Sequence, residues 1–366
     1  MKQAEVHTVP MGAPDDVSNV RALFKSGAVD PAHVIAIIAQ TEGDGYARGF
    51  AAQSMQLLLG KYLKISNQEV FDRIPMMMIG GTAGIMCPHY TLFVNKPAAN
   101  VTPSKEKRLV LGSASTRALL PEEYGRVAQV NLVTAAVEKA MAEAGITDPN
   151  DVVCVELKVP QMTGARMKEA ASRGKSVVND NALVASGMSR GASALGAAVA
   201  LGEIPASAVQ DEFIGRSTDI YSERASASSG SEQVGCRVVV IGNLAGSPSS
   251  LIAGRGVMND QLDLDGAYAA FHMAGLHIDN GKLTDESRKK FVTAFANAGA
   301  NYVPDVKGRR HTMLSDLLSA WAGHQAKAVV HAVISGIVGD TLHLANAGAE
   351  HQGRPGANLV CVVAKA

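Results

Sequence analysis

Short runs of apolar residues recur along the chain, and each run is bounded by Gly, Pro or Asn. A short apolar run between such breakers is typical of a strand that is buried on both faces or packed against helices. The runs that fit are VIAIIA (34–39), MMMIGG (76–81), VVCVEL (152–157), VVVIGN (238–243) and LVCVVA (359–364). We therefore expect buried strands at these five places.

Stretches rich in small residues lie between these runs and have the composition of helices. Two examples are SRGASALGAAVALGE (189–203) and HQAKAVVHAVISGIVG (324–339). Strands that alternate with helices along the chain are typical of α/β proteins. The pattern therefore predicts an α/β fold.

One arrangement of residues recurs three times. In each copy a strand ends in a polar residue, a helix then begins with a polar pair, and a pentad of mostly small residues follows the next strand. The strand ends are Gln40, Lys158 and Asn297, the pairs are Arg48-Gly49, Arg190-Gly191 and His324-Gln325, and the pentads are IGGTA (79–83), SSGSE (228–232) and NAGAE (346–350). This shared order predicts an internal threefold repeat.

Two stretches divide the three copies. They are the polar segment NVTPSKEK (100–107) and the turn-rich segment GSPSSLIAGRG (246–256). The predicted units are accordingly residues 1–103, 108–250 and 255–366.

Charge and composition narrow the classes of partner. The 366 residues include 34 basic and 34 acidic side chains, so the formal net charge is zero and no strong field attracts nucleic acid or an anionic membrane. The four cysteines are far apart in sequence and lack the CxxC spacing of metal or redox sites. No signal-like N-terminal segment and no long apolar run occurs. We expect a cytoplasmic protein without a nucleic-acid, membrane or cofactor partner.

Several longer motifs, in order along essentially the whole chain, carry a family resemblance. They are GGTAG (80–84) followed by PH (88–89), VVNDNALVASGMSRGASALGAA (177–198), ASASSGSE (225–232), GRRHTMLSD (308–316) and AEHQGRPG (349–356). With these motifs the sequence resembles the cyanuric acid hydrolase and barbiturase family of ring-opening amidohydrolases. The resemblance implies three similar α/β units around a pseudo-threefold axis, with a central β-barrel, helices outside and a homo-oligomeric, tetrameric assembly.

The resemblance also implies an active site on the axis, to which each unit contributes one Ser, one Lys and one Arg. Carried over by position, the middle unit keeps all three, as Ser228, Lys158 and Arg190. The first unit has Ile79, Gln40 and Arg48 at these positions, and the third has Asn346, Asn297 and His324. Neighbouring pentad residues complete the expected substrate-binding set: Gly80, Gly81, Ser229 and Ala347.

A serine hydroxyl is a weak nucleophile unless a neighbouring base takes its proton. Lysine serves as that base where burial and nearby cations lower its pKa, and Lys158 ends an apolar strand. The N–H groups of Ser229 and Gly230 are the candidates to stabilise an oxyanion. On this interpretation Ser228 is the nucleophile, whereas Ser226 and Ser231 only shape a loop.

The two incomplete units bear on the substrate. Asn297 and Asn346 hydrogen-bond but are not general bases at neutral pH, and Ile79 offers only an apolar wall. A ring carbonyl left unpaired against Ile79 costs about 1–3 kcal/mol. We therefore expect a cyclic amide or imide less symmetric than cyanuric acid, such as a barbiturate or another small heterocycle.

The segment 349–356 resembles the structural metal loop of the family, but the position of its glutamate is Gly299. Hard cations need such carboxylate oxygens, so we expect no metal. His311 and His351 have no metal-ligand spacing and are expected to be structural.

Less specific interpretations remain open at this stage. The serine patch can be a solvated loop, Lys158 a strand-end lysine facing water, and the arginines partners of surface acids. At the level of function, the alternatives are a non-catalytic binding or assembly homologue, and a hydrolase of a lactone or an acyclic amide that uses the same site.

Overall fold

The computed structural model describes residues 2–43, 45–81, 83–98, 104–299, 303–314 and 322–366. Three parts of the sequence-based predictions lie outside these ranges: Thr82 of the first pentad, the end of the first predicted unit at 99–103, and the last two residues of the 308–316 motif. Among the described residues, no helix combines the length and the apolar character that a membrane crossing requires.

Three four-stranded sheets carry the fold, and each has the same internal strand order. The first sheet is ordered β1 (Lys2–Pro10), β4 (His89–Pro97), β2 (Val34–Glu42), β3 (Met76–Gly81). The second is ordered β5 (Arg108–Ser115), β8 (Arg237–Leu244), β6 (Val152–Pro160), β7 (Ala225–Gly230). The third is ordered β9 (Leu251–Met258), β16 (Asn358–Lys365), β12 (Phe291–Ala298), β15 (Leu344–Ala347). The chain is therefore an α/β protein, as the sequence predicted.

Pairing within the three sheets is also alike. In each sheet the two central strands are antiparallel, and the last two strands are parallel. Each antiparallel pair contains one register shift, between Val34 and Ala36, Val152 and Cys154, and Phe291 and Thr293. All three shifts lie six residues before the polar strand-end residues Gln40, Lys158 and Asn297. Such bulges re-aim the side chains that follow them.

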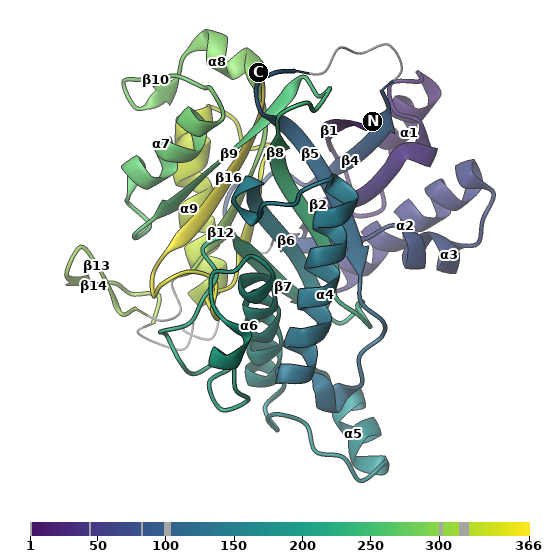
Figure 1. The fold of residues 1–366 in the computed structure, drawn as a ribbon, viewed down its shortest axis with the longest axis vertical. Coiled ribbons are helices and arrows are strands. Elements are labelled where there is room, and N and C mark those ends of the chain that lie inside the picture. The colour runs from purple at the N-terminus through teal and green to yellow at the C-terminus, as the bar shows by residue number, and fades with distance from the viewer. Residues whose placement is uncertain (1, 44, 82, 99–103, 300–302, 315–321) are drawn as a thin grey trace.

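Helices lie around a central group of strands in Figure 1. The helices of the first part are α1 (Ser18–Lys25), α2 (Tyr46–Leu63) and α3 (Asn67–Arg73). Those of the middle part are α4 (Val127–Ala144), α5 (Gly164–Ser172) and α6 (Ala182–Ala200). Those of the last part are α7 (Leu264–Met273), α8 (Asp285–Lys290) and α9 (Ala322–Val338). The last part also contains two short hairpins. Strands β10 (Ile278–Asp279) and β11 (Lys282–Leu283) lie between α7 and α8, and β13 (Asp305–Val306) and β14 (Arg309–Arg310) lie between β12 and α9.

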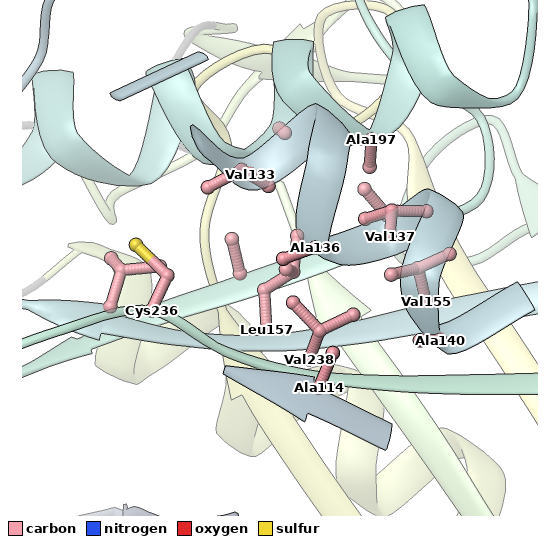
Figure 2. Packing of buried hydrophobic residues seen from close by; sticks show 14 of the residues in the cluster. Ala114, Val133, Ala136, Val137, Ala140, Val155, Leu157, Ala197, Cys236 and Val238 are labelled. Atoms are coloured by element: carbon pink, nitrogen blue, oxygen red, sulfur yellow. The ribbon is translucent and has the colours of Figure 1, made fainter. Parts of the chain in front are cut away.

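Each sheet buries both faces, which explains the continuous apolar runs in its central strands. One face packs against helices: in Figure 2, Val133 and Val137 of α4 lie over Val155 and Val238 of the second sheet. Small residues bring the helix close, since any side chain at Gly112 of β5 would overlap the backbone of α4.

The opposite faces of the three sheets meet in one shared core. That core includes Ile38, Phe93, Val239, Phe295 and Cys361, which come from all three sheets. Strands of different sheets also lie against one another, including β3 with β6, β7 with β15, and β15 with β2. The ends of the parallel strand pairs are thereby brought together.

The second predicted unit begins at Arg108, where β5 begins, whereas the third predicted unit begins at 255, inside β9. Strand β9 starts at Leu251, because the segment LIAGRG of the turn-rich stretch belongs to a strand. Its alternation of larger residues with glycine hid it from the search for continuous apolar runs.

Candidate active site

The parallel pairing in each sheet joins the residues that the repeat predicted as partners. Lys158 of β6 is the register partner of Ser228 of β7. Gln40 pairs in the same way with Ile79, and Asn297 pairs with Asn346. Register partners on parallel strands point to the same face and lie about 5 Å apart. The structure therefore pairs Lys158 with Ser228, Gln40 with Ile79 and Asn297 with Asn346, as the repeat alignment predicted.

The pair Lys158 and Ser228 points away from the helices. The residues that alternate with it, Leu157, Val159 and Ala227, belong to the core beneath α4 and α6. Side chains alternate between faces along a strand, so Lys158 and Ser228 face the space shared by the three sheets.

A cavity of about 390 Å³ lies where the three parallel strand pairs end. Most residues predicted from sequence line it: Arg48, Ile79, Gly80, Lys158, Arg190, Ser228, Ser229, His324, Asn346 and Ala347. The predicted residues Gln40, Gly81 and Asn297 are not among those lining it. Residues that line it without having been predicted are Gly45, Gln161, Leu183, Ser186, Gly323 and Lys327.

Gln40 and Asn297 hold backbone segments instead of facing the cavity. Gln40 Nε2 donates to the Ile79 carbonyl (3.2 Å), and its Oε1 accepts from the Ala345 N–H (3.0 Å). Asn297 Nδ2 donates to the Gly348 carbonyl (2.8 Å). Lys158 Nζ also donates to a pentad carbonyl, that of Ser229 (3.1 Å), although the accepting carbonyl is at a different pentad position in each sheet. In the first and third sheets an amide thus replaces the lysine as the group that fixes the pentad.

Ser228 is 6 % exposed, and its Oγ has no hydrogen-bond partner in the described part of the chain. Lys158 is 1 % exposed, and its Nζ lies 3.8 Å from Glu232 Oε1. The Glu232 carboxylate folds over Gly230, where a side chain would overlap it. A carboxylate at this distance stabilises the ammonium form of the lysine. Glu232 entered the sequence analysis only as a marker of the pentad.

Arg190 is held in the cavity wall by two partners. Its Nε and Nη2 donate to both oxygens of Glu350 (3.0 and 2.5 Å), and its Nη1 donates to Ser229 Oγ (3.1 Å). Burial alone would raise the pKa of Glu350, but the Arg190 guanidinium outweighs it and lowers that pKa below its usual range. This bidentate pair fixes the guanidinium plane beside the cavity.

Lys327 of α9 lines the cavity as well as His324 and is a second candidate for the position equivalent to Arg190. Lys327 is buried and its Nζ donates to the Gly80 carbonyl. A Cβ atom placed on Gly84, just after the first pentad, would lie 2.9 Å from Cβ of Ala328, the residue after Lys327. In the same way, a Cβ atom placed on Gly191, the residue after Arg190, would lie 2.7 Å from Cδ2 of His351, just after the third pentad. These equivalent contacts align Lys327 with Arg190.

His324 lines the cavity but lies one helical turn earlier. The prediction of His324 assumed that the polar pair begins the helix, whereas Arg190 lies in the third turn of α6. The signal that identifies Lys327 was present: a cation followed by a small residue in Arg48-Gly49, Arg190-Gly191 and Lys327-Ala328.

Two further expectations concern the serines and histidines. Residues 225–230 form strand β7 and not a solvated loop, so Ser226 does not shape a loop but lies in the core at 2 % exposure. His351 accepts from the Gly215 N–H (2.7 Å) and lies 2.7 Å from the Ile220 carbonyl. His311 lies 2.9 Å from the Val303 carbonyl. Both histidines are thus engaged with backbone groups.

At the position of the family's metal-loop glutamate, Gly299 has no space for a side chain, which would overlap the Ala357 carbonyl. Within the described ranges, no three His, Cys, Asp or Glu side chains come close enough to hold a metal ion. The expectation that the protein needs no metal stays a prediction.

We expect Glu350→Gln to lower the free energy of unfolding by about 2–3 kcal/mol, because Arg190 loses a part-buried carboxylate partner. The pKa of Glu350 is lowered in the folded state. The difference in unfolding free energy between parent and variant therefore has its full value above pH 4.5, the ordinary carboxyl pKa, and becomes smaller as the pH falls below it. Denaturant unfolding at several pH values measures it. The control is Glu106→Gln, which removes the exposed carboxylate partner (76 % exposed side chain) of Arg108 Nη2 and should change stability by about 1 kcal/mol or less. Equal effects would show that the Arg190 pair is no more than a surface ion pair.

Comparison with known proteins agrees with this geometry. The model of the family described as amidohydrolase ring-opening protein matches residues 5–365. A cyclic amide hydrolase from Azorhizobium caulinodans is 40% identical over 365 residues, covering 99% of both chains. A cyanuric acid amidohydrolase from Enterobacter cloacae is 39% identical over 369 residues, again covering 99% of both.

Solved structures give the same result. A cyanuric acid hydrolase structure superposes with a TM-score of 0.94 at 37% identity over 100% of both chains. The crystal structure of a cyanuric acid hydrolase from A. caulinodans gives a TM-score of 0.90 at 37% identity, covering 100% of this chain and 99% of that one. The resemblance inferred from the motifs is confirmed, and the chain belongs to the family of ring-opening amidohydrolases.

Proposed function

We propose that this protein opens the ring of a cyclic amide or imide by hydrolysing a C–N bond, with Ser228 as nucleophile and Lys158 as its base. One observation carries the proposal. Lys158 and Ser228 are register partners that face one cavity, and the equivalent pairs hold no such combination. The names of the relatives, cyclic amide hydrolase and cyanuric acid amidohydrolase, support the reaction class.

In the first half of the reaction, Ser228 Oγ attacks a ring carbonyl carbon while neutral Lys158 takes the hydroxyl proton. The ammonium formed on Lys158 is stabilised by the Glu232 carboxylate at 3.8 Å, much as an acid stabilises the charged base of a catalytic triad. The carbonyl oxygen becomes an oxyanion. When it collapses, the C–N bond breaks and Lys158 returns the proton to the leaving ring nitrogen. The product stays attached to Ser228 as an ester.

In the second half, a water molecule attacks this ester and gives its proton to Lys158. Collapse of the second oxyanion releases the carboxylic acid, and Lys158 returns the proton to Ser228 Oγ. No other co-reactant is needed. Lys158 would move from the Ser229 carbonyl toward Ser228 Oγ once a ring fills the cavity, since such bonds often form only in the substrate complex.

The cavity wall has the charges to stabilise these oxyanions. Arg48, Arg190 and Lys327 line it from three different helices. Guanidinium and ammonium groups in a site that excludes water stabilise developing negative charge strongly. They also bind ring carbonyls in the ground state.

We further propose that the three sheets, with units near 1–103, 108–250 and 255–366, are related by a pseudo-threefold axis and form a central barrel. The shared strand order and the equivalent register shifts support this. A cyclic contact pattern supports it too. Helix α6 contacts the third pentad, α9 contacts the first, and α2 shares a cavity with Glu232 of the second.

The substrate is proposed to be less symmetric than cyanuric acid. Ile79 occupies the position in the cavity wall where the middle unit has Ser228. An apolar side chain there favours a ring with a hydrocarbon edge, because a ring carbonyl would lose its hydrogen bond.

Ser228→Ala and Lys158→Ala should each lower kcat by about 10³-fold or more, and the double variant should lose little beyond either single one, since the pair acts as a unit. The assay is hydrolysis of a panel of cyclic amides and imides. Ser231→Ala is the matched control, because Ser231 is exposed and outside the cavity lining, and it should stay within about twofold of the parent. A Ser228→Ala variant that keeps most of the activity would exclude the proposed nucleophile, and multiplicative losses would exclude a coupled pair.

Cyanuric acid should be turned over far more slowly than the best ring with a hydrocarbon edge. Ile79→Ser should raise kcat/KM for cyanuric acid about tenfold relative to that ring, since it restores one polar partner worth about 1–2 kcal/mol. Met77→Leu changes a buried residue of the same strand below the cavity lining and should leave the ratio unchanged. Comparable turnover of both rings by the parent enzyme would refute the substrate proposal.

A further inference from the structure

The layer directly beneath the cavity is apolar in two sheets and polar in one. Two residues before each register pair lie Ile38 with Met77, Phe295 with Leu344, and Glu156 with Ser226. The first two pairs belong to the shared core. Glu156 and Ser226 are 4 % and 2 % exposed, and strand alternation places them on the same face as Lys158 and Ser228. A buried carboxyl therefore lies about 7 Å along β6 from the proposed base.

Side chains on neighbouring strands connect this carboxyl to the cavity wall. Ser226 is the register partner of Glu156 on the same face of the sheet, and Asn346 Nδ2 donates to Ser226 Oγ (3.3 Å). Asn346 itself lines the cavity. The three side chains thus form a chain from the core to the position where a substrate ring binds.

Burial raises the pKa of Glu156 to about 7, against the opposing effect of the hydrogen bonds from Ser226 and Cys154. Cys154 Sγ lies 3.9 Å from Glu156 Oε1, and the neighbouring Cys361 thiol of β16 together with burial raises the pKa of Cys154. The positive charge of Arg255 on β9 acts in the opposite direction and lowers the pKa of Cys154. On β8, the residue paired with Glu156 is the apolar Val239. Within the described residues, the ionisable groups around Glu156 are therefore Cys154, Cys361 and Arg255 and, toward the cavity, Lys158 and Glu232.

The direction of the chain depends on where the proton is. If Glu156 is ionised, Ser226 donates to it and accepts from the Asn346 amide nitrogen, so Asn346 Oδ1 is left toward the cavity. If Glu156 is protonated, it donates to Ser226 Oγ, and the Ser226 proton then needs an acceptor. Asn346 Oδ1 supplies it after the amide turns over, which leaves the NH2 group toward the cavity.

We propose that Glu156 and Ser226 are positioning residues that decide whether Asn346 offers the substrate ring an acceptor or a donor. The proposal rests on the proposed function, because it names a determinant of specificity in the same site. With Glu156 ionised, Asn346 accepts from a ring N–H. With Glu156 protonated, it donates to a ring carbonyl. This gives Ser226 a role that the sequence did not indicate.

The first test needs no substrate. Carbon-13 NMR of protein labelled at the glutamate carboxyls, with the Glu156 signal assigned from its absence in Glu156→Gln, should show a titration near neutral pH. Ser226→Ala should raise that midpoint, since the carboxylate loses a donor. A Glu156 that stays ionised to about pH 5, or a midpoint that Ser226→Ala leaves unchanged, overturns the proposal whatever the enzyme hydrolyses.

The second test uses glutarimide, whose N–H does not ionise near neutral pH and whose CH2 groups can face Ile79. For the parent enzyme kcat/KM should rise about tenfold per pH unit below the NMR midpoint and level off above it. Glu156→Gln should remove this inflection, and Glu156→Asp should keep one. Glu203→Gln is the control, because Glu203 is a largely buried carboxylate paired with Arg224 and is not part of the cavity lining; it should keep the parent profile.

The outcomes separate this proposal from the function itself. An inflection that persists unchanged in Glu156→Gln overturns the positioning role and leaves the hydrolase mechanism standing. If glutarimide is not hydrolysed, its binding constant replaces kcat/KM: tighter binding on ionisation of Glu156, absent in Glu156→Gln, supports the proposal, and any other result overturns it.

Discussion

The structure depends on the parallel register between β6 and β7. That register places Lys158 beside Ser228, on the face of the sheet that does not pack against helices. A shift of β7 by one residue would turn Ser228 into the core beneath α4 and α6 and leave Lys158 without it. The register shift between Val152 and Cys154, and the apolar residues that alternate with the pair, hold it in place. The proposed chemistry therefore follows from the packing of one strand pair.

Burying a lysine so completely requires compensation. Lys158 is 1 % exposed, and its Nζ is met by the Ser229 carbonyl and by Glu232. Arg190 is met in the same way by Glu350, which belongs to the next part of the chain. Each of these partners comes from a pentad, so the pentads supply both the backbone of the cavity and the counter-charges of its cations. Loss of either carboxylate would remove the anionic partner of a cation in the cavity wall.

Much of this arrangement was predictable from sequence, because it depends on short-range order along the chain. The continuous apolar runs at 76–81 and 152–157 became β3 and β6, and the repeat alignment matched the register pairs residue for residue. What escaped prediction depends on contacts between distant segments. The contact of Lys327 with the Gly80 carbonyl joins segments 247 residues apart, whereas β9 was missed for a local reason, because glycine interrupts its apolar residues. The role of Gln40 as a backbone partner required the position of Ala345, which lies 305 residues away.

The central claim is that Ser228 becomes acylated, and mass spectrometry of a rapidly quenched reaction tests it most directly. Ring opening expels no fragment, so the acyl-enzyme should carry the whole mass of the substrate. Proteolytic mapping should locate this added mass at Ser228, within the peptide that contains strand β7. The account predicts that the adduct appears before product and is absent from Ser228→Ala. Active enzyme quenched during turnover without any adduct, or an adduct located on Ser229 or elsewhere, would contradict it.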